Sequence, residues 1–198
     1  MMMVWPANPP VSPFAKGGKI FVGADPCVRP LYTKTMAEEL FDIVDENDRV
    51  TGTALRSDVH GNSTLIHRSV HVHVFNSAGE LFLQLRGLDK ETQPGKWDSS
   101  VGGHVASGEV PEAAAVREME EELGITGVAP EFLYRYLWRT DFESEMVRTY
   151  RCVWDGPLRL LASEIDDGRF WSFTEIEKEI GRGTFTPNFE EEWRRLRE

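Results

Sequence analysis

The sequence predicts an α+β protein in which a mixed β-sheet lies between helices, an α/β/α sandwich. Two observations lead to this prediction. Several short strands come first, then one long helix, then further strands and a helical C-terminus, and no internal repeat interrupts that order. The chain also has 198 residues, which is enough for one domain with a sizeable core.

Residues 1–35 are expected to form an extension that precedes the folded domain. They contain six prolines and three glycines, and their apolar residues show no periodicity. Such composition is typical of an extended segment rather than of a helix or a strand. We therefore assign residues 36–198 to the domain.

Two hairpins are predicted at the start of the domain. The first joins strands over residues 40–44 and 50–55 through the polar turn DENDR. The second joins strands over residues 69–75 and 80–86 through the turn NSAG. In both cases the apolar runs are bounded by residues that favour turns.

A short strand that ends at Gly102-Gly103 is predicted to lead into the long helix, over residues 111–123. Pro111 suits the first turn of a helix, where a missing N–H costs nothing, and Gly124 suits the position just past the end. Between them the good helix formers Ala, Leu, Met, Glu and Arg dominate.

This helix is expected to have an apolar face and an acidic face. The helical period places on one side Val116, Met119 and Leu123. It gathers on the opposite side the carboxylates of Glu118, Glu121 and Glu122. Each like-charged pair on an exposed helix costs about 0.2–0.5 kcal/mol, so a bound divalent cation would offset the repulsion.

The remainder of the chain is predicted to complete the sheet and its second helical layer. Strands are expected over residues 131–139, 145–154 and 169–173, and helices over residues 174–181 and 187–197.

Composition limits the partners and the compartment. A net charge of −11 and a pI of about 5.0 argue against a nucleic-acid backbone or an anionic membrane as the main partner. No apolar run approaches the length of a membrane span, and the N-terminus lacks the pattern of a signal peptide. Cys27 and Cys152 are too far apart in sequence for a disulfide framework or a zinc knuckle, so we expect a cytoplasmic protein.

Residues 103–125, GHVASGEVPEAAAVREMEEELGI, carry the motif that identifies the chemistry. They fit the pattern G-x5-E-x7-R-E-U-x-E-E-x-G-U, where U is apolar, at Gly103, Glu109, Arg117, Glu118, Met119, Glu121, Glu122, Gly124 and Ile125. This is the signature of the Nudix hydrolases, which the chain therefore resembles. The resemblance implies a mixed sheet sandwiched between helices.

The alternative interpretation of the acidic helix face is that it is merely solvated. Two features favour metal binding instead. The pair Gly102-Gly103 lets the backbone approach a ligand closely, and Arg117 is placed to orient carboxylates such as Glu109 and Glu121. We therefore expect the helix to bind a metal ion.

A second resemblance is narrower. Residues 74–109 resemble type I isopentenyl-diphosphate isomerases. In that family a stretch like NSVCGHP lies between a tryptophan and a Gly-Glu pair, and here WDSSVGGHVASGE, residues 97–109, occupies that place. Those isomerases bind a metal through three histidines and two glutamates, to which correspond His60, His67, His104, Glu143 and Glu145. Their diphosphate-binding arginine and lysine correspond to Arg86 and Lys90.

The chemistry of these residues is consistent with a second metal site. Imidazole and carboxylate together suit Mn²⁺ or Zn²⁺, whereas an all-carboxylate helix suits Mg²⁺. Glu143 and Glu145 would lie on one face of a strand. The alternative is that the histidines are ordinary polar residues, as we expect of His71 and His73, which would lie on a strand face.

The departures from the isomerases favour hydrolysis. Gly102 stands where those enzymes have the cysteine that moves a proton, and glycine has no side chain to do so. Conversely, isomerases of this type have a degraded Nudix motif, whereas here it is complete.

We therefore expect hydrolysis, dependent on Mg²⁺ or Mn²⁺, of a small-molecule diphosphate linked to another group X. Glu118, Glu121 and Glu122 would hold the ion, and the backbone of Gly103 would add an oxygen ligand. A second divalent ion, Mn²⁺ or Zn²⁺, would bind the histidine and glutamate cluster. Arg86 and Lys90 would position the diphosphate, and Arg117 would orient the glutamates.

Several alternatives stay open. The general base is Glu118 or Glu164, and X is a nucleoside, an isoprenoid or another group. The rival functions are an isopentenyl-diphosphate isomerase and a non-catalytic nucleotide sensor, although sensors commonly lose the glutamates that are present here. The oligomeric state is also open, with a homodimer among the options.

Overall fold

The computed structural model describes residues 38–198, and the predicted extension of residues 1–35 lies outside them. Along the chain the elements are β1 (Leu40–Val44), β2 (Val50–Leu55), α1 (Arg56–Val59), β3 (Ile66–Phe75), β4 (Leu81–Arg86), β5 (Trp97–Asp98), β6 (Val101–His104), α2 (Pro111–Leu123), β7 (Glu131–Arg139), β8 (Ser144–Val153), β9 (Ile165–Trp171), α3 (Phe173–Glu179) and α4 (Pro187–Arg197). The α+β class is confirmed.

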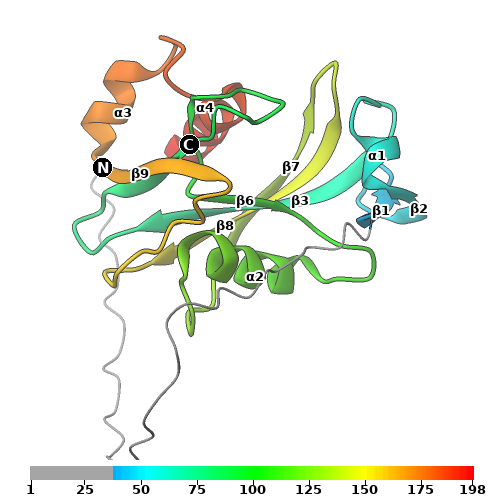
Figure 1. The fold of residues 1–198 in the computed structure, drawn as a ribbon, viewed down its shortest axis with the longest axis horizontal. Helices are drawn as coiled ribbons and strands as arrows, with labels where there is room; N and C mark the ends of the chain where they lie inside the picture. The colour runs from blue at the N-terminus through cyan, green and yellow to red at the C-terminus, as the bar shows by residue number, and fades with distance from the viewer. Residues whose placement is uncertain (1–37) are drawn as a thin grey trace, which may run out of the picture. The chain divides into compact units, whose positions relative to one another are not determined.

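β3 is the strand around which the sheet is built (Figure 1). It pairs antiparallel with β6 and parallel with β8, and β8 pairs antiparallel with β7. The parallel register runs from Ile66↔Ser144 to Phe75↔Val153, so the sheet is mixed as predicted. The β1–β2 hairpin joins the start of β3, while β4 pairs with β5 and β9.

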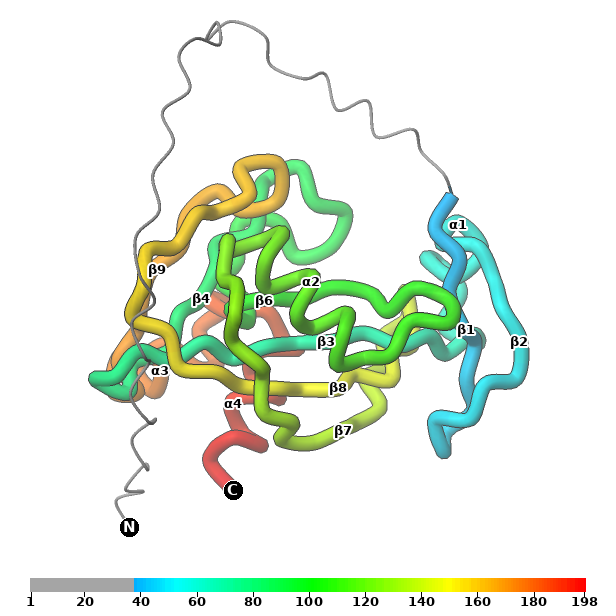
Figure 2. Tube along the Cα trace, turned by 90° about the horizontal axis from the view of Figure 1, so that it is seen from below, coloured from blue at the N-terminus to red at the C-terminus, as the bar shows by residue number. Residues whose placement is uncertain are grey.

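Helices cover both faces of the sheet. α2 lies across β3, β6 and β8 on one face, and α3 and α4 lie on the other (Figures 1 and 2). The α2 side buries alternate residues of β3, Val70, Val72 and Val74. The opposite side of the sheet packs on α3 and α4 through a second cluster that includes Leu81, Leu83, Ile176, Phe189 and Trp193.

α2 has the predicted bounds because its end signals are local. Pro111 stands at the start, and Gly124 closes the helix in the left-handed conformation at φ 70°, donating its N–H to the carbonyl of Glu120. Met119 and Leu123 are buried against the sheet, and each contributes about 1.5–3 kcal/mol to folding. No helix within residues 38–198 is long and apolar enough to cross a membrane.

The structure departs from the predicted elements mainly at β3, α1 and β9. β3 begins at Ile66 rather than at residue 69, and the short helix α1 was not predicted. β9 spans Ile165–Trp171 rather than residues 169–173, so the acidic stretch after Glu164 belongs to a strand. The cause is tertiary, because β9 pairs with β4 and Gly168 leaves room for the ring of Phe82, whose Cζ would lie 2.3 Å from an added Cβ.

Asp48 in the β1–β2 turn ties this hairpin to the sheet. Its side chain is nearly buried, and its carboxylate accepts hydrogen bonds from Arg68 at 2.6 Å, Arg148 at 2.7 Å and Arg135 at 3.1 Å. The three arginines come from β3, β8 and β7. Burial alone would raise the pKa of Asp48, but the hydrogen bonds from Arg68 and Arg148 outweigh it and lower the pKa.

The substitution Asp48→Asn is expected to lower the free energy of unfolding by about 2–3 kcal/mol at pH 7, because bonds to a charged acceptor contribute about that much. Asparagine keeps the size and tolerates the positive φ of 66°. A folded-state pKa below the unfolded value adds stability only above the unfolded pKa. The loss should therefore shrink as the pH falls through the folded-state value.

Urea denaturation of wild type and variant measures this effect. Glu46→Gln is the control, since Glu46 is 72% exposed and pairs only with Arg139 across the surface. It should cost less than about 1 kcal/mol. Equal denaturation midpoints for Asp48→Asn and the wild type would contradict the role given to Asp48.

Candidate functional site

The first group of candidate residues lies where α2 meets β6. The Glu118 carboxylate packs directly on the backbone of Gly103, since an added Cβ there would lie 2.1 Å from Glu118 Cδ. No side chain fits at residue 103 while Glu118 keeps this place. The glycine therefore serves to seat a carboxylate against the strand.

Arg117 holds this region together. Its guanidinium donates to both oxygens of Glu109 at 3.0 Å, to Glu118 at 2.6 Å and to the carbonyl of His104 at 3.0 Å, and it lies 3.6 Å from Glu121. These contacts are those of a residue that orients glutamates, the role predicted for Arg117.

Glu118 and Glu122 are partly or wholly buried carboxylates with few donors. Glu122 is 4% exposed and accepts only long bonds, from Gln84 at 3.3 Å and from the Gly102 N–H at 3.4 Å. Burial, helped by Glu118 and Glu164, raises its pKa well above the usual range. Burial likewise raises the pKa of Glu118 to about 7, although Arg117 opposes the shift. Carboxylates left in this condition fit a divalent cation such as Mg²⁺, which prefers oxygen ligands.

Glu121 and Glu164 complete the acidic group. Glu121 is 55% exposed on α2, so it faces solvent beside Arg117. Glu164 comes from the turn before β9 and forms an ion pair with Lys90 at 3.1 Å. Its charge helps to raise the pKa of both Glu118 and Glu122, which places it beside the α2 carboxylates.

The two residues predicted to bind a diphosphate both have partners within the protein. Arg86 donates to Asp98 at 3.1 Å and to the carbonyl of Thr92 at 3.0 and 3.2 Å, so it also holds the loop between β4 and β5. Lys90 lies on that loop and its charge lowers the pKa of Glu122, opposing burial. Lys90 is thus the cation placed toward the α2 carboxylates.

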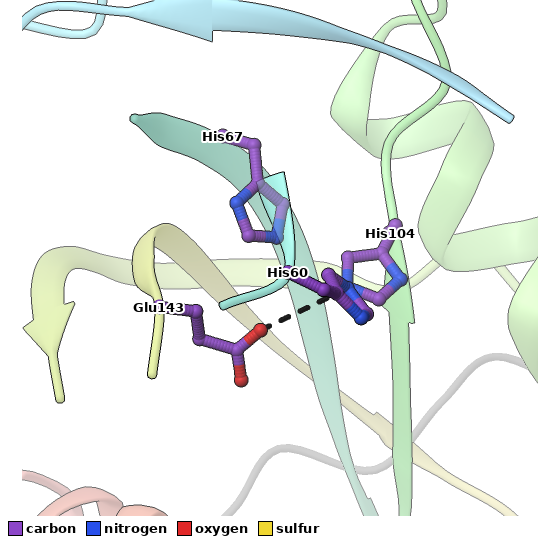
Figure 3. Close-up of side chains that lie close together, drawn as sticks. All are labelled: His60, His67, His104 and Glu143. Atoms are coloured by element: carbon purple, nitrogen blue, oxygen red, sulfur yellow. Dashed lines mark ion pairs between the residues drawn. The ribbon is translucent and has the colours of Figure 1, made fainter. Parts of the chain in front are cut away.

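The second group of candidate residues gathers beyond the other face of β6. Ligand atoms of His60, His67, His104 and Glu143 all lie within 4.8 Å of one another. Figure 3 shows the three imidazoles and the carboxylate turned toward a common region. Glu145 is next to this group, with its carboxylate 3.8 Å from His67 Nε2 and 4.0 Å from His104 Nε2.

Strand register explains how residues so far apart in sequence meet. The parallel β3–β8 pairing sets Glu145 beside His67, and the antiparallel β3–β6 pairing sets His104 beside Ser69. His60 follows α1, and Glu143 precedes β8.

The imidazoles of this group are neutral. Within residues 38–198 several of their ring nitrogens have no hydrogen-bond partner, whereas His104 Nδ1 lies 3.1 Å from Nη1 of Arg56. Both ring nitrogens of His67 and the Nε2 of His60 are buried without a hydrogen bond. Burial, together with His60, lowers the pKa of His67 to about 4, and burial lowers that of His104 further below its usual range. Burial and Glu145 raise the pKa of Glu143 to about 7. Unpartnered neutral imidazoles beside carboxylates fit a transition-type ion such as Mn²⁺ or Zn²⁺.

His71 and His73 lie on a face of β3 and outside the histidine and glutamate group, as predicted, but their burial beside a carboxylate was not predicted. Both rings are buried under α4, where their nitrogens lie 3.1 and 3.7 Å from the carboxylate of Glu192. Glu192 was not singled out from the sequence. The alternation of His67, Ser69, His71 and His73 was a signal that these residues share a face, but nothing local indicated their partner on α4.

Comparisons with known proteins agree with this geometry. The family model described as NUDIX domain matches residues 65–189. A Nudix hydrolase of Pseudomonas aeruginosa, described as uncharacterized, is 40% identical over 132 residues, which are 67% of this chain and 78% of the relative. An isopentenyl-diphosphate Delta-isomerase of Photorhabdus laumondii is 30% identical over 159 residues, 76% of this chain and 90% of the relative.

The fold is also found in solved structures. A crystal structure of a Deinococcus radiodurans protein matches with a TM-score of 0.68 at 28% identity, covering 79% of this chain and 98% of the other. Together the matches confirm the resemblance to Nudix proteins with relatives among the isomerases.

The substitution Gly103→Ala is expected to weaken Mg²⁺ binding by about 10–100-fold, the usual effect of disturbing residues that support metal ligands. The added methyl group would displace Glu118 from the strand. Isothermal titration calorimetry measures the affinity. The control is Gly52→Ala, at a glycine with open space around its Cβ position. Unchanged Mg²⁺ affinity in Gly103→Ala would show that Glu118 is not a ligand.

Proposed function

The chain belongs to the NUDIX domain family, and on that premise we propose that it hydrolyses a diphosphate linked to another group X, with the help of a divalent metal ion. The observation that carries the proposal is the set of α2 carboxylates, two of them buried with raised pKa values and one of them seated on Gly103. Carboxylates held this close together repel one another when they are ionised, and a bound divalent cation would offset that repulsion.

The residues divide the work as follows. Glu118, Glu121 and Glu122, with the backbone oxygen of Gly103, would hold Mg²⁺ or Mn²⁺. A bound ion of this kind neutralises charge on phosphate oxygens and lowers the pKa of water.

The remaining residues bind the substrate and handle the proton. Lys90 and Arg86 bind the diphosphate, the lysine as a point charge and the arginine as a fork. Arg117 orients Glu118 and Glu109. Glu118 and Glu164 are the two carboxylates placed to accept the proton of the attacking water, and a pKa of about 7 suits Glu118 for that task near neutral pH.

Isomerisation of isopentenyl diphosphate is the second candidate, and the histidine and glutamate cluster favours it. Curated relatives with both names match the chain, so the comparisons do not separate the two reactions. Gly102 does favour hydrolysis, because allylic proton transfer needs a side chain that glycine lacks.

A direct assay separates the two reactions. Hydrolysis of a panel of nucleoside diphosphate derivatives and of isopentenyl diphosphate is measured with and without Mg²⁺ by chromatography of the phosphate monoesters formed, and proton NMR follows the isopentenyl diphosphate. We expect metal-dependent hydrolysis of at least one compound. Appearance of dimethylallyl diphosphate would establish the isomerase instead.

The substitution Glu122→Gln is expected to reduce turnover at least about a hundredfold, because it removes a charge that stabilises the reacting groups. It should also raise the melting temperature of metal-free protein at pH 8. The folded-state pKa of Glu122 is raised, so its stabilising contribution is lost as the pH rises, and a neutral amide avoids that loss.

Two further variants control this result. Glu121→Gln should reduce turnover equally but change the melting temperature little, because Glu121 is exposed. Glu120→Gln, an exposed charge change on the same helix, should leave turnover unchanged. Wild-type turnover in Glu122→Gln on a confirmed substrate would refute the carboxylate site.

We also propose that His60, His67, His104, Glu143 and Glu145 hold a second ion, Mn²⁺ or Zn²⁺. Protein purified without chelator should contain this ion, and His67→Ala should lack it, as measured by elemental analysis. His73→Ala is the matched control, a buried histidine of the same strand outside the group. In the metal-free site burial raises the pKa of Glu143 to about 7 and lowers that of His67 to about 4, so protonation of the carboxyl should weaken the affinity for the ion as the pH falls below about 7.

Equal metal content in His67→Ala and the wild type would show that these histidines hold no ion. The resemblance to the isomerases would then end at the fold.

A further inference from the structure

Glu192 of α4 is a buried carboxylate at the centre of a polar group. Its side chain is 0% exposed, and it accepts hydrogen bonds from Thr149 at 2.7 Å and from Ser99 at 2.6 Å. The Nδ1 of His71 lies 3.1 Å from its Oε1, and the Nε2 of His73 lies 3.7 Å from its Oε2. Four side chains, from β3, β8 and the segment before β6, thus converge on one carboxylate.

Stability alone does not account for this arrangement. Glu192 lies on α4 between Phe189 and Trp193, which belong to the apolar core on this side of the sheet. Replacing buried ion pairs by apolar residues of similar volume is usually neutral or stabilising. A polar group kept in such surroundings is therefore a candidate for function.

The contact with Glu192 fixes the direction of the His71 ring. Since Nδ1 faces the carboxylate, Nε2 is the nitrogen left for another partner. A Cβ added at Gly102 would lie 3.4 Å from that Nε2 and 3.3 Å from Cδ2, so this edge of the ring faces Gly102. His71 keeps 11% of its side chain exposed, whereas His73 keeps none.

Gly102 connects His71 with the α2 carboxylates. Its N–H donates to Glu122 at 3.4 Å, while its α-carbon faces His71. In the β3–β6 pairing His71 lies opposite Gly102, and the next pair on the same face of the sheet is Ser69 opposite His104. The second group of candidate ligands, to which His104 belongs, therefore begins one pair away from His71. His71 therefore borders the strand segment that lies between both groups.

The charge around this segment calls for a cation. The candidate ligands contribute the carboxylates of Glu118, Glu121, Glu122, Glu143 and Glu145, and Arg117 and Lys90 are paired with carboxylates. A carboxylate at Nδ1 favours a ring that also carries a proton on Nε2. In agreement, burial alone would lower the pKa of His71, but Glu192 raises it to about 9.

We propose that His71 contacts the substrate at Gly102, its Nε2–H donating to an anionic phosphate oxygen, and that Glu192 is the positioning residue that holds its ring. The inference deepens the proposed function, from which it takes the class of substrate. The proposal rests on three contacts: Glu192 with His71, His71 with Gly102, and Gly102 with Glu122.

Binding of inorganic pyrophosphate tests this proposal without relying on turnover. Its dissociation constant is measured by calorimetry in Mg²⁺ for wild type, His71→Gln and His73→Gln. We expect His71→Gln to bind at least about tenfold more weakly, the scale of one lost bond to a charged group. The matched control His73→Gln, which shares Glu192 and the strand, should stay within about twofold of the wild type.

The positioning role has its own readout. Glu192→Gln should weaken pyrophosphate binding, and the double variant with His71→Gln should bind no worse than His71→Gln alone, because Glu192 acts through His71. Equal losses in His71→Gln and His73→Gln, or additive losses in the double variant, would mark a structural role and overturn the proposal.

NMR of ¹⁵N-labelled histidine in the wild type keeps the test decisive if a variant fails to fold. Pyrophosphate should shift the Nε2 signal of His71 and leave that of His73 in place, and no shift at His71 would overturn the proposal. Failures remain distinguishable from those of the proposed function. If the protein hydrolyses a substrate but binds pyrophosphate equally well without His71, this inference alone is refuted. If pyrophosphate binding depends on His71 but no compound is hydrolysed, the proposed reaction alone is refuted.

Discussion

The absence of side chains at two successive positions of β6 is the constraint on which the site depends. Successive residues of a strand face opposite sides of the sheet. Gly103 therefore opens the α2 side, where Glu118 occupies the place of a Cβ, and Gly102 opens the other side, where His71 approaches. A side chain at either position would push a polar group away from the strand. The glycine pair thus lets polar groups approach the same short backbone from both faces.

The buried carboxylates of this domain fall into two kinds, which differ in whether the protein itself supplies hydrogen-bond donors to them. Glu192 and Asp48 are supplied with donors by the protein, and their pKa values are lowered although burial opposes it. Glu122 and Glu143 lack such donors, and their pKa values are raised. A protein that satisfies some buried charges and leaves others unsatisfied places the unsatisfied ones where an external cation can complete them. His67, with both ring nitrogens unpartnered, belongs to the second kind.

Local signals and long-range contacts explain what the sequence could predict. The bounds of α2 followed from Pro111 and Gly124, since a helix start and stop depend on adjacent residues. The group of α2 carboxylates was predicted from the spacing of the Nudix motif, and the group of histidines and glutamates from the resemblance to the isomerases. The members of the second group do lie near one another. The extent of β9 was not predictable, because its pairing with β4 decides it. The contact of His71 with Glu192 was equally hidden, since it joins β3 to a helix at the far end of the chain and no spacing rule links them.

The choice between hydrolysis and isomerisation depends on the same backbone position. Both candidate ligand groups exist in this chain, and they lie on either side of β6 within reach of Gly102 and its neighbours. A thiol at residue 102 would need a Cβ 3.3 Å from His71 Cδ2, which is tighter than most contacts of a real Cβ. His71 is held by Glu192, whose other bonds to Ser99 and Thr149 leave it little freedom to yield. A side chain at residue 102 would therefore require the His71 ring to shift by a few tenths of an ångström. Residue 102 is a glycine in this chain and cannot move an allylic proton, which is why we propose hydrolysis rather than isomerisation.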